Sequence, residues 1–232
     1  MKHKELITNS IIALILVSLS VITMCFTPLA ITASATPKPI YKGNGLNSSV
    51  SLMVNVYWGE EYLPDMLDTF DKYDVKTTFF VGGSWVSKND GMLKEILSRG
   101  HEIANHGYLH KDQDKLDMEG NLREISMCHN IVEKTIGYKM TLFAPPSGAF
   151  SNDTLKAANN LGYQTIMWSK DTIDWRDKNA QLIYERATKK ISYGDLVLMH
   201  PTKCTAEALP NILEFYKQKG IKADKVSNVI QN

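Results

Sequence analysis

The sequence has little excess charge of either sign. Its 232 residues carry 26 Lys and Arg side chains against 25 Asp and Glu, a formal net charge of +1. Without the first 35 residues, 24 basic side chains face 24 acidic ones. Nucleic-acid binding depends on surplus positive charge, so no nucleic-acid partner is expected. Hydrophobic residues make up 44% of the chain, enough to fill a core, so disorder, collagen-like repeats and a polytopic membrane protein are not expected either.

Cysteine is also scarce, with three in the whole chain. After the first 35 residues only Cys128 and Cys204 remain, and their spacing does not match a cysteine metal clip. In an oxidising compartment the two can form one disulfide, but two free, partly buried thiols are the expected state.

Only one long run without charge is present, Ile11–Ile31. It follows a short basic start and precedes Ala33-Ser34-Ala35, a small-x-small pattern that signal peptidases accept. About 20 apolar residues are enough to cross a bilayer. We therefore predict that residues 1–35 are a signal peptide or an N-terminal membrane anchor and that the domain lies outside the cytoplasm. Cleavage after Ala35 and retention of residues 11–31 both stay open, and this segment is the only membrane contact expected.

The remaining 197 residues fit one domain of ordinary size. Residues 36–49 are rich in Pro, Gly and Asn and are predicted to be a linker, so the domain is expected over residues 50–232. There, short β-rich runs alternate with helical patterns, which predicts an α/β fold with a parallel sheet wrapped by helices. An open doubly wound sheet and an incomplete βα barrel both agree with this pattern. Strands are predicted at 51–56, 76–81, 101–104, 142–143, 163–167 and 196–199, and helices at 60–73, 93–98, 119–136, between 151 and 162, 180–190 and 206–219.

Polar residues cluster directly after several predicted strands, where both candidate folds place their site. His106 and His110 form an H-x-x-x-H pair whose imidazoles can bind one metal ion, although such a pair alone is more often an ordinary histidine pair. His200 ends an apolar strand, where a histidine is either a core residue or a functional group. Asp171 and Asp174 either cap and solvate a turn or orient and charge a histidine for general acid catalysis.

Five segments follow one another along the chain: 73–86 (YDVKTTFFVGGSWV), 100–110 (GHEIANHGYLH), 144–149 (APPSGA), 171–175 (DTIDW) and 198–200 (LMH). In order and spacing these motifs resemble the polysaccharide deacetylases, the NodB-homology, family 4 carbohydrate esterases. The resemblance spans about residues 50–219. Since the family's fold is a distorted, incomplete (β/α) barrel, the resemblance implies the barrel and not the open sheet.

The resemblance implies metal-dependent removal of acetyl groups from N-acetylated glycan of the cell wall or spore wall. His106 and His110 would hold the divalent metal ion, zinc in most members, which makes hydroxide available near neutral pH. His200 would be the general acid, tuned by Asp174 with help from Asp171. The implied substrate contacts are Trp175, Leu198 (with the acetyl methyl group), Pro145 and Ser147.

The first family motif is where the match fails. Thr-Phe-Asp-Asp-Gly in the family is Asn-Val-Tyr-Trp-Gly at residues 55–59, so Tyr57 and Trp58 replace the base and the third metal ligand. The Arg that pairs with the base in the family is Ala144 here. Losing the base and its cation together avoids an unpaired buried charge, which indicates a remodelled site. We therefore expect a weakened metal site, with no metal at all as the alternative.

Glu60 and Glu61 open the following helix, where acids are favourable with the helix dipole, and either is a candidate substitute carboxylate. The altered motif and the leader together resemble a sporulation-associated branch of the family. Three functions stay open. They are deacetylation of an N-acetylated envelope glycan, a glycan-binding or structural role on a catalytically impaired fold, and, with least support, metal-dependent hydrolysis of a small amide.

Overall fold

The computed structural model describes residues 2–25 and 37–231, which belong to two units that divide after residue 35. The first unit contains helix α1 (Lys2–Cys25). No helix among the described residues is both long enough and apolar enough to span a membrane. The predicted cleavage position after Ala35 lies outside the described residues, so export and anchoring stay predictions.

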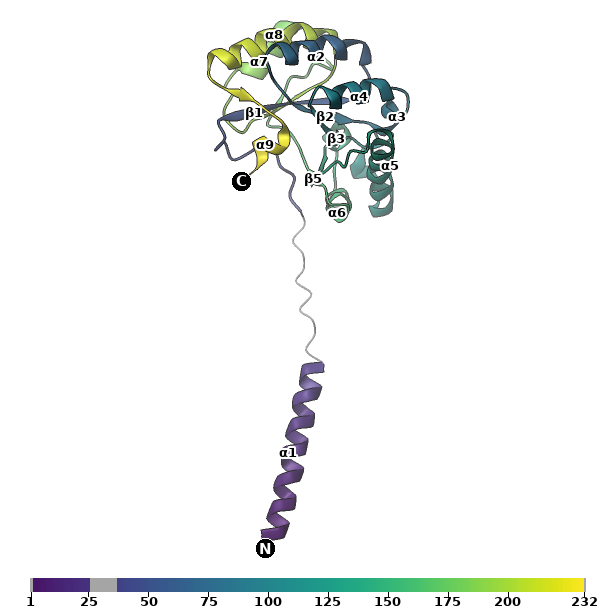
Figure 1. Cartoon of the computed structure of the whole chain (residues 1–232), viewed down its shortest axis with the longest axis vertical. Helices are drawn as coiled ribbons and strands as arrows, with labels where there is room; N and C mark the ends of the chain where they lie inside the picture. The colour runs from purple at the N-terminus through teal and green to yellow at the C-terminus, as the bar shows by residue number, and fades with distance from the viewer. Residues whose placement is uncertain (1, 26–36, 232) are drawn as a thin grey trace. The chain divides into compact units, whose positions relative to one another are not determined.

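The second unit is built on a curled parallel sheet that forms a half-barrel, with helices on its outer side (Figure 1). The strands follow the order β5-β4-β3-β2-β1-β7-β6, and β8 pairs with the start of β1. This order follows the chain around the curl without a switch point, which confirms the incomplete barrel over the open doubly wound sheet. The strands are β1 (Ser49–Val56), β2 (Thr78–Val81), β3 (Glu102–Asn105), β4 (Leu142–Phe143), β5 (Gln164–Thr165), β6 (Lys170–Asp171), β7 (Leu196–Met199) and β8 (Lys222–Ala223).

Four of the eight α-helices described in this unit begin at a residue whose side chain accepts a hydrogen bond from the first turn. Asp117 caps the longest of them, because its side chain accepts a hydrogen bond from Gly120 N at 2.7 Å, and Gly137 ends it with φ 65°. The helices are α2 (Leu63–Lys72), α3 (Gly83–Val86), α4 (Asp90–Ser98), α5 (Met118–Ile136), α6 (Asn152–Asn160), α7 (Ala180–Thr188), α8 (Lys203–Gln218) and α9 (Val226–Ile230), with 3₁₀ turns at Glu60–Tyr62, Gln113–Lys115 and Pro146–Gly148.

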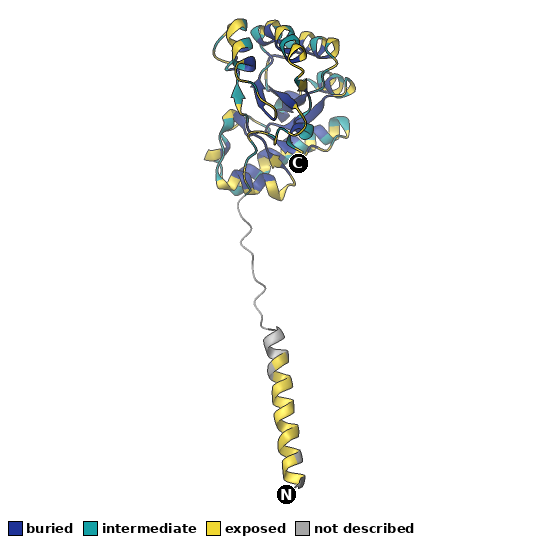
Figure 2. Ribbon diagram, turned by 90° about the vertical axis from the view of Figure 1, so that its left-hand side faces the viewer, coloured by how far each residue is buried: buried dark blue, intermediate teal, exposed yellow. Residues whose placement is uncertain are grey.

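The sheet separates two apolar clusters, and strand alternation assigns residues to each. Leu52 and Val54 of β1 belong to the larger cluster, between the sheet and the helices. Met53 belongs to the smaller one with Phe80 and Leu198 of the neighbouring strands, inside the curl. All residues of β1 are buried, as a central parallel strand requires (Figure 2).

The helices and strands predicted from the sequence are present, some with shifted ends, and the elements that were not predicted are short. The helix predicted at 60–73 is a 3₁₀ turn followed by α2, and the helix predicted at 206–219 begins earlier, at Lys203. Thr202 caps that helix, because its hydroxyl accepts from Thr205 N at 3.0 Å. Strands β6 and β8 were not predicted, since two residues carry no recognisable alternation.

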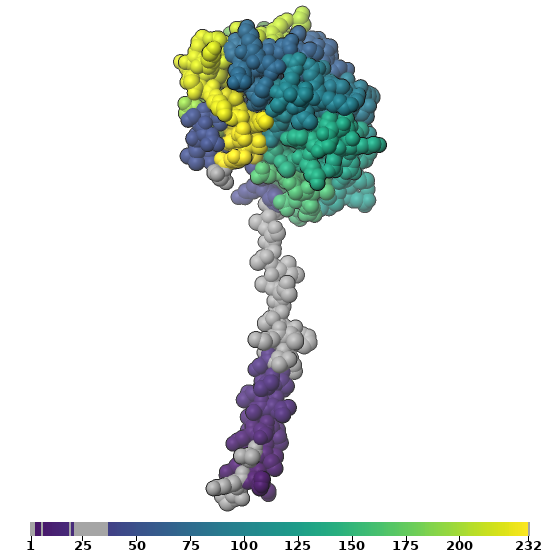
Figure 3. Space-filling model, viewed as in Figure 1, coloured from purple at the N-terminus to yellow at the C-terminus, as the bar shows by residue number. Residues whose placement is uncertain are grey.

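The segment 37–48, where a linker is predicted, lies against the domain. Ile40 N donates to Thr165 O at 2.9 Å, and Met167 N donates to Ile40 O at 2.8 Å. Asn47 donates through its side chain to Asn228 O at 3.0 Å. Figure 3 shows the C-terminal residues, in yellow, beside these early residues of the domain. The contacts of the domain therefore begin at Ile40, ahead of Val50.

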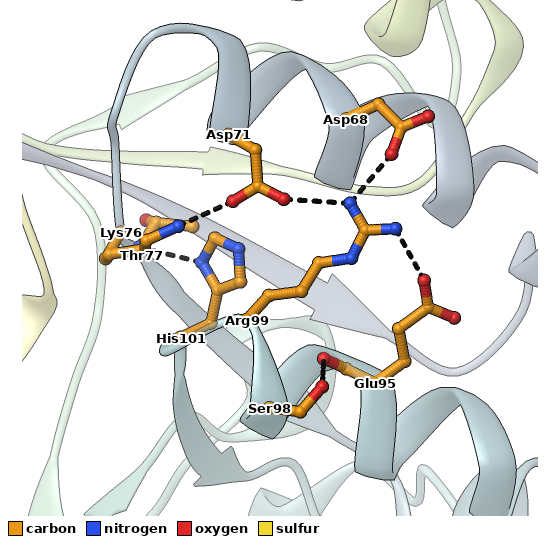
Figure 4. Close-up of polar contacts among 8 residues, drawn as sticks. All are labelled: Asp68, Asp71, Lys76, Thr77, Glu95, Ser98, Arg99 and His101. Carbon is orange, nitrogen blue, oxygen red and sulfur yellow. Dashed lines mark hydrogen bonds and ion pairs between the residues drawn. The ribbon is translucent and has the colours of Figure 1, made fainter.

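An ion-pair network joins α2 to α4 at the end of the sheet where β3 begins (Figure 4). Arg99 contacts Asp68 at 2.7 Å, Asp71 at 2.8 Å and Glu95 at 2.6 Å. Lys76 and Arg99 hold the pKa of the Asp71 carboxyl below its usual value. Because these groups are largely exposed, the network contributes modestly to stability.

The two cysteines of the domain are free thiols, as expected. Cys128 is buried and Cys204 is partly buried. Burial raises the pKa of the Cys128 thiol to about 12, so it behaves as an apolar core residue.

Candidate functional site

A cleft of about 380 Å³ opens at the carboxyl ends of the strands. It is the place where a half-barrel brings together the residues that follow separate strands. Most of the residues singled out in the sequence meet there. The cleft is lined by Asn55, Tyr57, Trp58, His106, His110, Ser147, Trp168, Asp171, Trp175, Leu198 and His200.

The loop after β3 folds back on itself and brings His106 and His110 together. Their ring centroids are 5.1 Å apart. The carboxylate of Glu124, on α5, accepts hydrogen bonds from Tyr108 N at 3.1 Å and Leu109 N at 2.7 Å. His110 itself has φ 55°, which the loop holds in the left-handed region. The H-x-x-x-H pair therefore lies on a clamped loop and not on a helical turn.

The two imidazoles are neutral at physiological pH. Burial lowers the pKa of His106 to about 3, and it also lowers the pKa of His110. His106 Nδ1 lies 2.8 Å from Ala144 O, so this nitrogen carries the proton and Nε2 keeps its lone pair. A neutral imidazole with its tautomer fixed in this way is suited to bind a metal ion.

The residues present do not complete a catalytic metal site. Such a zinc site takes three protein ligands and keeps a further position open. Within the described part of the chain, no three His, Cys, Asp or Glu side chains converge as a metal site would need. Glu60 and Glu61 are exposed and do not line the cleft, so neither replaces the missing aspartates. Weak metal binding by His106 and His110 alone stays a prediction.

Tyr57 fills the position of the family's base with an aromatic ring. Its ring lies against Gly82, where an added Cβ would come within 2.2 Å of it. Its hydroxyl accepts a hydrogen bond from Ser84 Oγ at 2.6 Å, and its ring centroid is 4.9 Å from that of His110. Because the ring is held from both sides, it cannot leave the base position free for an incoming carboxylate.

Trp58 occupies the position of the third metal ligand. Its indole stacks on the imidazole of His200, with ring centroids 5.8 Å apart and planes 7° apart. Trp58 is 44% exposed, so its ring covers His200 and also faces solvent. The next residue, Gly59, has φ 82° and leaves no room for a Cβ beside Pro201 O.

His200 and Asp174 form an intact dyad beneath this stack. Asp174 Oδ1 lies 2.8 Å from His200 Nδ1, and Asp174 Oδ2 accepts from His200 N and from Thr205 Oγ1, both at 2.6 Å. Asp174 is 1% exposed and acts on His200 from behind, without lining the cleft itself. These hydrogen bonds fix the carboxylate, which in turn orients the imidazole of His200.

The other predicted residues divide between the wall and the surroundings of the cleft. Asp171 lines it, and burial raises the pKa of its carboxyl. Trp175 is 53% exposed at the rim, and Leu198 lies on the floor. Ser147 lines the cleft from a turn with φ 56°, whereas Pro145 is buried and does not line it.

Trp168 and Asn55 also line the cleft, but neither is among the site residues predicted from the sequence. From the sequence, Asn55 was open as a neutral metal ligand or, with more support, as a strand-end hydrogen-bonding residue. Trp168 packs beside Gly148, where an added Cβ would lie 2.8 Å from its ring. The sequence feature that could have identified Trp168 is its position as a large aromatic residue directly after a predicted strand. Asn55 had a clearer signal, because it is a polar residue in an apolar strand.

The sequence profile described as polysaccharide deacetylase matches residues 42–166, more than half of the chain. The chain belongs to the polysaccharide deacetylase family. Two curated relatives come from Bacillus subtilis (strain 168). The uncharacterized protein YlxY is 40% identical over 197 residues, covering 85% of this chain and 62% of YlxY. The peptidoglycan-N-acetylmuramic acid deacetylase PdaA is 29% identical over 195 residues, covering 82% of this chain and 74% of PdaA.

A solved structure of the family also resembles this chain. BA3943 from Bacillus anthracis is a family 4 carbohydrate esterase pseudoenzyme, with a TM-score of 0.82, 37% identity and coverage of 84% of this chain and 69% of that one. A mutant of BA3943 with restored enzymatic activity has the same TM-score. The family therefore contains hydrolases of C–N bonds as well as members that have lost the activity.

Proposed function

We propose that this deacetylase-family protein binds N-acetylated cell-wall glycan in the cleft without hydrolysing it. The observation that carries this proposal is the position of Trp58. Its indole stacks on His200 where the family has its third metal ligand. An aromatic ring can neither bind the metal ion nor accept a proton from water, but its face can contact a sugar ring.

The cleft has the composition of a carbohydrate site without its catalytic acids. Trp58, Trp168 and Trp175 supply aromatic surface, and neutral histidines supply hydrogen-bonding groups. Ligand sites commonly combine apolar and aromatic walls with a few placed polar groups. Curated relatives are named as deacetylases of peptidoglycan, PdaA on its N-acetylmuramic acid and the Listeria monocytogenes PgdA on its N-acetylglucosamine. The glycan proposed for this chain is therefore peptidoglycan-like.

The proposed place of action rests on the leader. Residues 11–31 carry no charge, and we propose that they export the domain or anchor it to the outer side of the membrane. There the domain meets wall glycan directly. A role in the spore envelope is part of the proposal, because the altered first motif resembles the sporulation-associated branch.

Weak metal-dependent deacetylation is the second candidate function. The intact pair of His200 and Asp174 favours it, since this pair retains the arrangement of a general acid. His106 and His110 also keep free lone pairs directed to a common cleft. What this candidate lacks is a base and a third ligand among the described residues.

The decisive experiment measures binding and hydrolysis on the same protein. Wild-type protein is titrated with N-acetylglucosamine oligomers in the presence of a chelator, and acetate release is measured separately with added zinc. We expect saturable binding without metal and no acetate above the protein-free blank. Acetate release at a rate that rises with zinc, and that His106→Ala abolishes, would establish the second candidate instead. Absence of binding to oligomers and to peptidoglycan would exclude the glycan-binding proposal.

A further inference from the structure

Asn55 lies at the carboxyl end of β1, on the face that points into the curl of the sheet. The preceding residue on this face is Met53, and its neighbours in the same interior cluster include Phe80 and Leu198. An amide in this row of apolar side chains is unexpected from packing alone, because an apolar residue of similar size would fill the space. Asn55 is 4% exposed and nevertheless lines the cleft.

The side-chain amide of Asn55 has no hydrogen-bond partner in the described protein. Its Oδ1 is fully buried and unpaired. Its Nδ2 makes no hydrogen bond within the described residues either, and because it is not enclosed, it is the end that the cleft reaches. Asn105 shows the contrast, since its Oδ1 accepts from Gly107 N at 2.9 Å and its Nδ2 donates to Ile125 O at 2.9 Å. Among the described residues, the side-chain amides of Gln113 and Asn121 also have buried unpaired atoms, but neither lines the cleft, so Asn55 alone brings an unpaired amide to it.

From this contrast we infer that Asn55 is the residue that recognises the acetamide group of the bound glycan. Its Nδ2 donates a hydrogen bond to the carbonyl oxygen of the acetamide. Leu198, on the adjacent strand β7, lines the same part of the cleft and supplies apolar surface for the methyl group. This inference rests on the proposed glycan-binding function and adds the group by which the cleft selects its ligand.

The same contact explains how binding is separated from hydrolysis. A neutral amide donor holds a carbonyl oxygen in place but polarises the carbonyl far less than a cation does. Asn55 offers a donor to the acetamide carbonyl and Leu198 offers apolar surface to its methyl group, and neither contact is available to a protonated sugar amine, whose desolvation is costly. The cleft should therefore prefer an N-acetylated sugar over the free amine that deacetylation produces.

The test compares two tetramers, one of N-acetylglucosamine and one of glucosamine, by isothermal titration of the full chain with chelator present. Wild-type protein should bind the acetylated tetramer more tightly. In Asn55→Leu, affinity for the acetylated tetramer should fall about tenfold or more, equivalent to about 1.4 kcal/mol, while affinity for the glucosamine tetramer stays within about twofold. Asn159→Leu, at an exposed position of α6, is the matched control and should change neither affinity.

Two further measurements keep the inference falsifiable. Asn55→Asp keeps the size of the side chain and replaces the donor with an acceptor, so it should lose the same preference if Asn55→Leu does not fold. The thermal midpoint of Asn55→Leu should not fall, because the amide that it removes has no protein partner. Unchanged preference for the acetylated tetramer in either folded variant would overturn the role of Asn55 and leave the glycan-binding function standing. Failure of wild-type protein to bind either tetramer would overturn both.

Discussion

The indole of Trp58 lies parallel to the imidazole of His200, with their centroids 5.8 Å apart. His200 is held on its other side by Asp174, so its ring has a fixed orientation. Trp58 fills the position of the family's third metal ligand, and it exposes an aromatic face to solvent there. One substitution thus removes a catalytic group and adds a binding surface.

Restoring both aspartates should restore hydrolysis. In Tyr57→Asp/Trp58→Asp a carboxylate joins His106 and His110, and a second one supplies a base, which completes a three-ligand metal site. With zinc added, we expect acetate release from N-acetylglucosamine oligomers at a rate about 10²- to 10⁴-fold above that of Trp58→Asp alone, which is the usual contribution of a general base. A mutant of the similar pseudoenzyme BA3943 has restored enzymatic activity, so mutation can return hydrolysis to a protein of this fold.

The matched control for this pair is Tyr57→Asn/Trp58→Asn, which has the same side-chain size and no carboxylate. It should release no acetate. If the aspartate pair binds stoichiometric zinc and glycan but stays inactive, the loss of the two carboxylates does not account for the loss of activity. Addition of Ala144→Arg then tests whether the missing cation is also required.

The two exposed indoles of the cleft should carry much of the glycan affinity. Trp58 and Trp175 are 44% and 53% exposed at the rim. Removing either ring in Trp58→Ala or Trp175→Ala should weaken binding of N-acetylglucosamine oligomers by about tenfold or more, as truncation of a central tryptophan commonly does. Titration calorimetry measures this directly. Tyr193→Ala removes a comparably exposed ring outside the cleft and should leave affinity unchanged.

The loop that carries the histidine pair depends on Glu124. This carboxylate is 4% exposed and accepts from two successive backbone N–H groups, Tyr108 N and Leu109 N. Glu124→Ala leaves both donors without a partner and should lower the free energy of unfolding by about 2–3 kcal/mol, measured by urea denaturation. Glu207→Ala, at an exposed position of α8, should change it by less than about 0.5 kcal/mol. Equal effects of the two substitutions would show that Glu124 does not clamp the loop.

Stability should fall as the pH drops below about 6.5, in part because of His101. This imidazole is 2% exposed between Phe70 and Phe79, and burial lowers its pKa from 6.5 to about 4. Between pH 6.5 and pH 4 the unfolded chain binds a proton that the folded protein does not. The free energy of unfolding therefore falls by about 1.4 kcal/mol for each unit by which the pH is lowered. Its Nδ1 accepts a hydrogen bond from Thr77 N at 3.1 Å, which also requires the neutral ring.

The measurement is the free energy of unfolding of wild-type protein and His101→Gln from pH 4 to 8. Between pH 4 and 6.5, the free energy of unfolding of the variant should change less steeply with pH than that of the wild type, by about 1.4 kcal/mol per pH unit. Above pH 7 the two slopes should coincide, because His101 is neutral in both states there. Parallel curves over the whole range would mean that His101 titrates normally in the folded protein.

Most helices and strands were predictable from the sequence, whereas strands β6 and β8 were not. The pattern over 119–136 predicts α5 almost to the residue, because a long amphipathic period and a final Gly are local signals. Strand β6 has no such signal, and it exists because Lys170 and Asp171 pair with Val197 and Leu198 of β7. Local sequence patterns do not predict long-range pairing of this kind.

The candidate site was predictable in its members and not in its geometry. His106, His110, Asp171, Trp175 and His200 all meet in one cleft, as their positions after strands predict. The same reasoning left open whether an acid from the next helix would enter the cleft. The tertiary structure shows that Glu60 and Glu61 are exposed and do not line the cleft.

The sequence by itself determined the family, the half-barrel and the loss of both aspartates, because ordered motifs and strand ends are local features. Only the tertiary structure decided what takes their place. Gly59, with φ 82°, turns the chain so that Trp58 packs on His200 while Glu60 and Glu61 face solvent. It also left the amide of Asn55 without a protein partner inside an apolar curl. Both outcomes depend on contacts between strands far apart in the chain, and no local pattern of residues encodes such contacts.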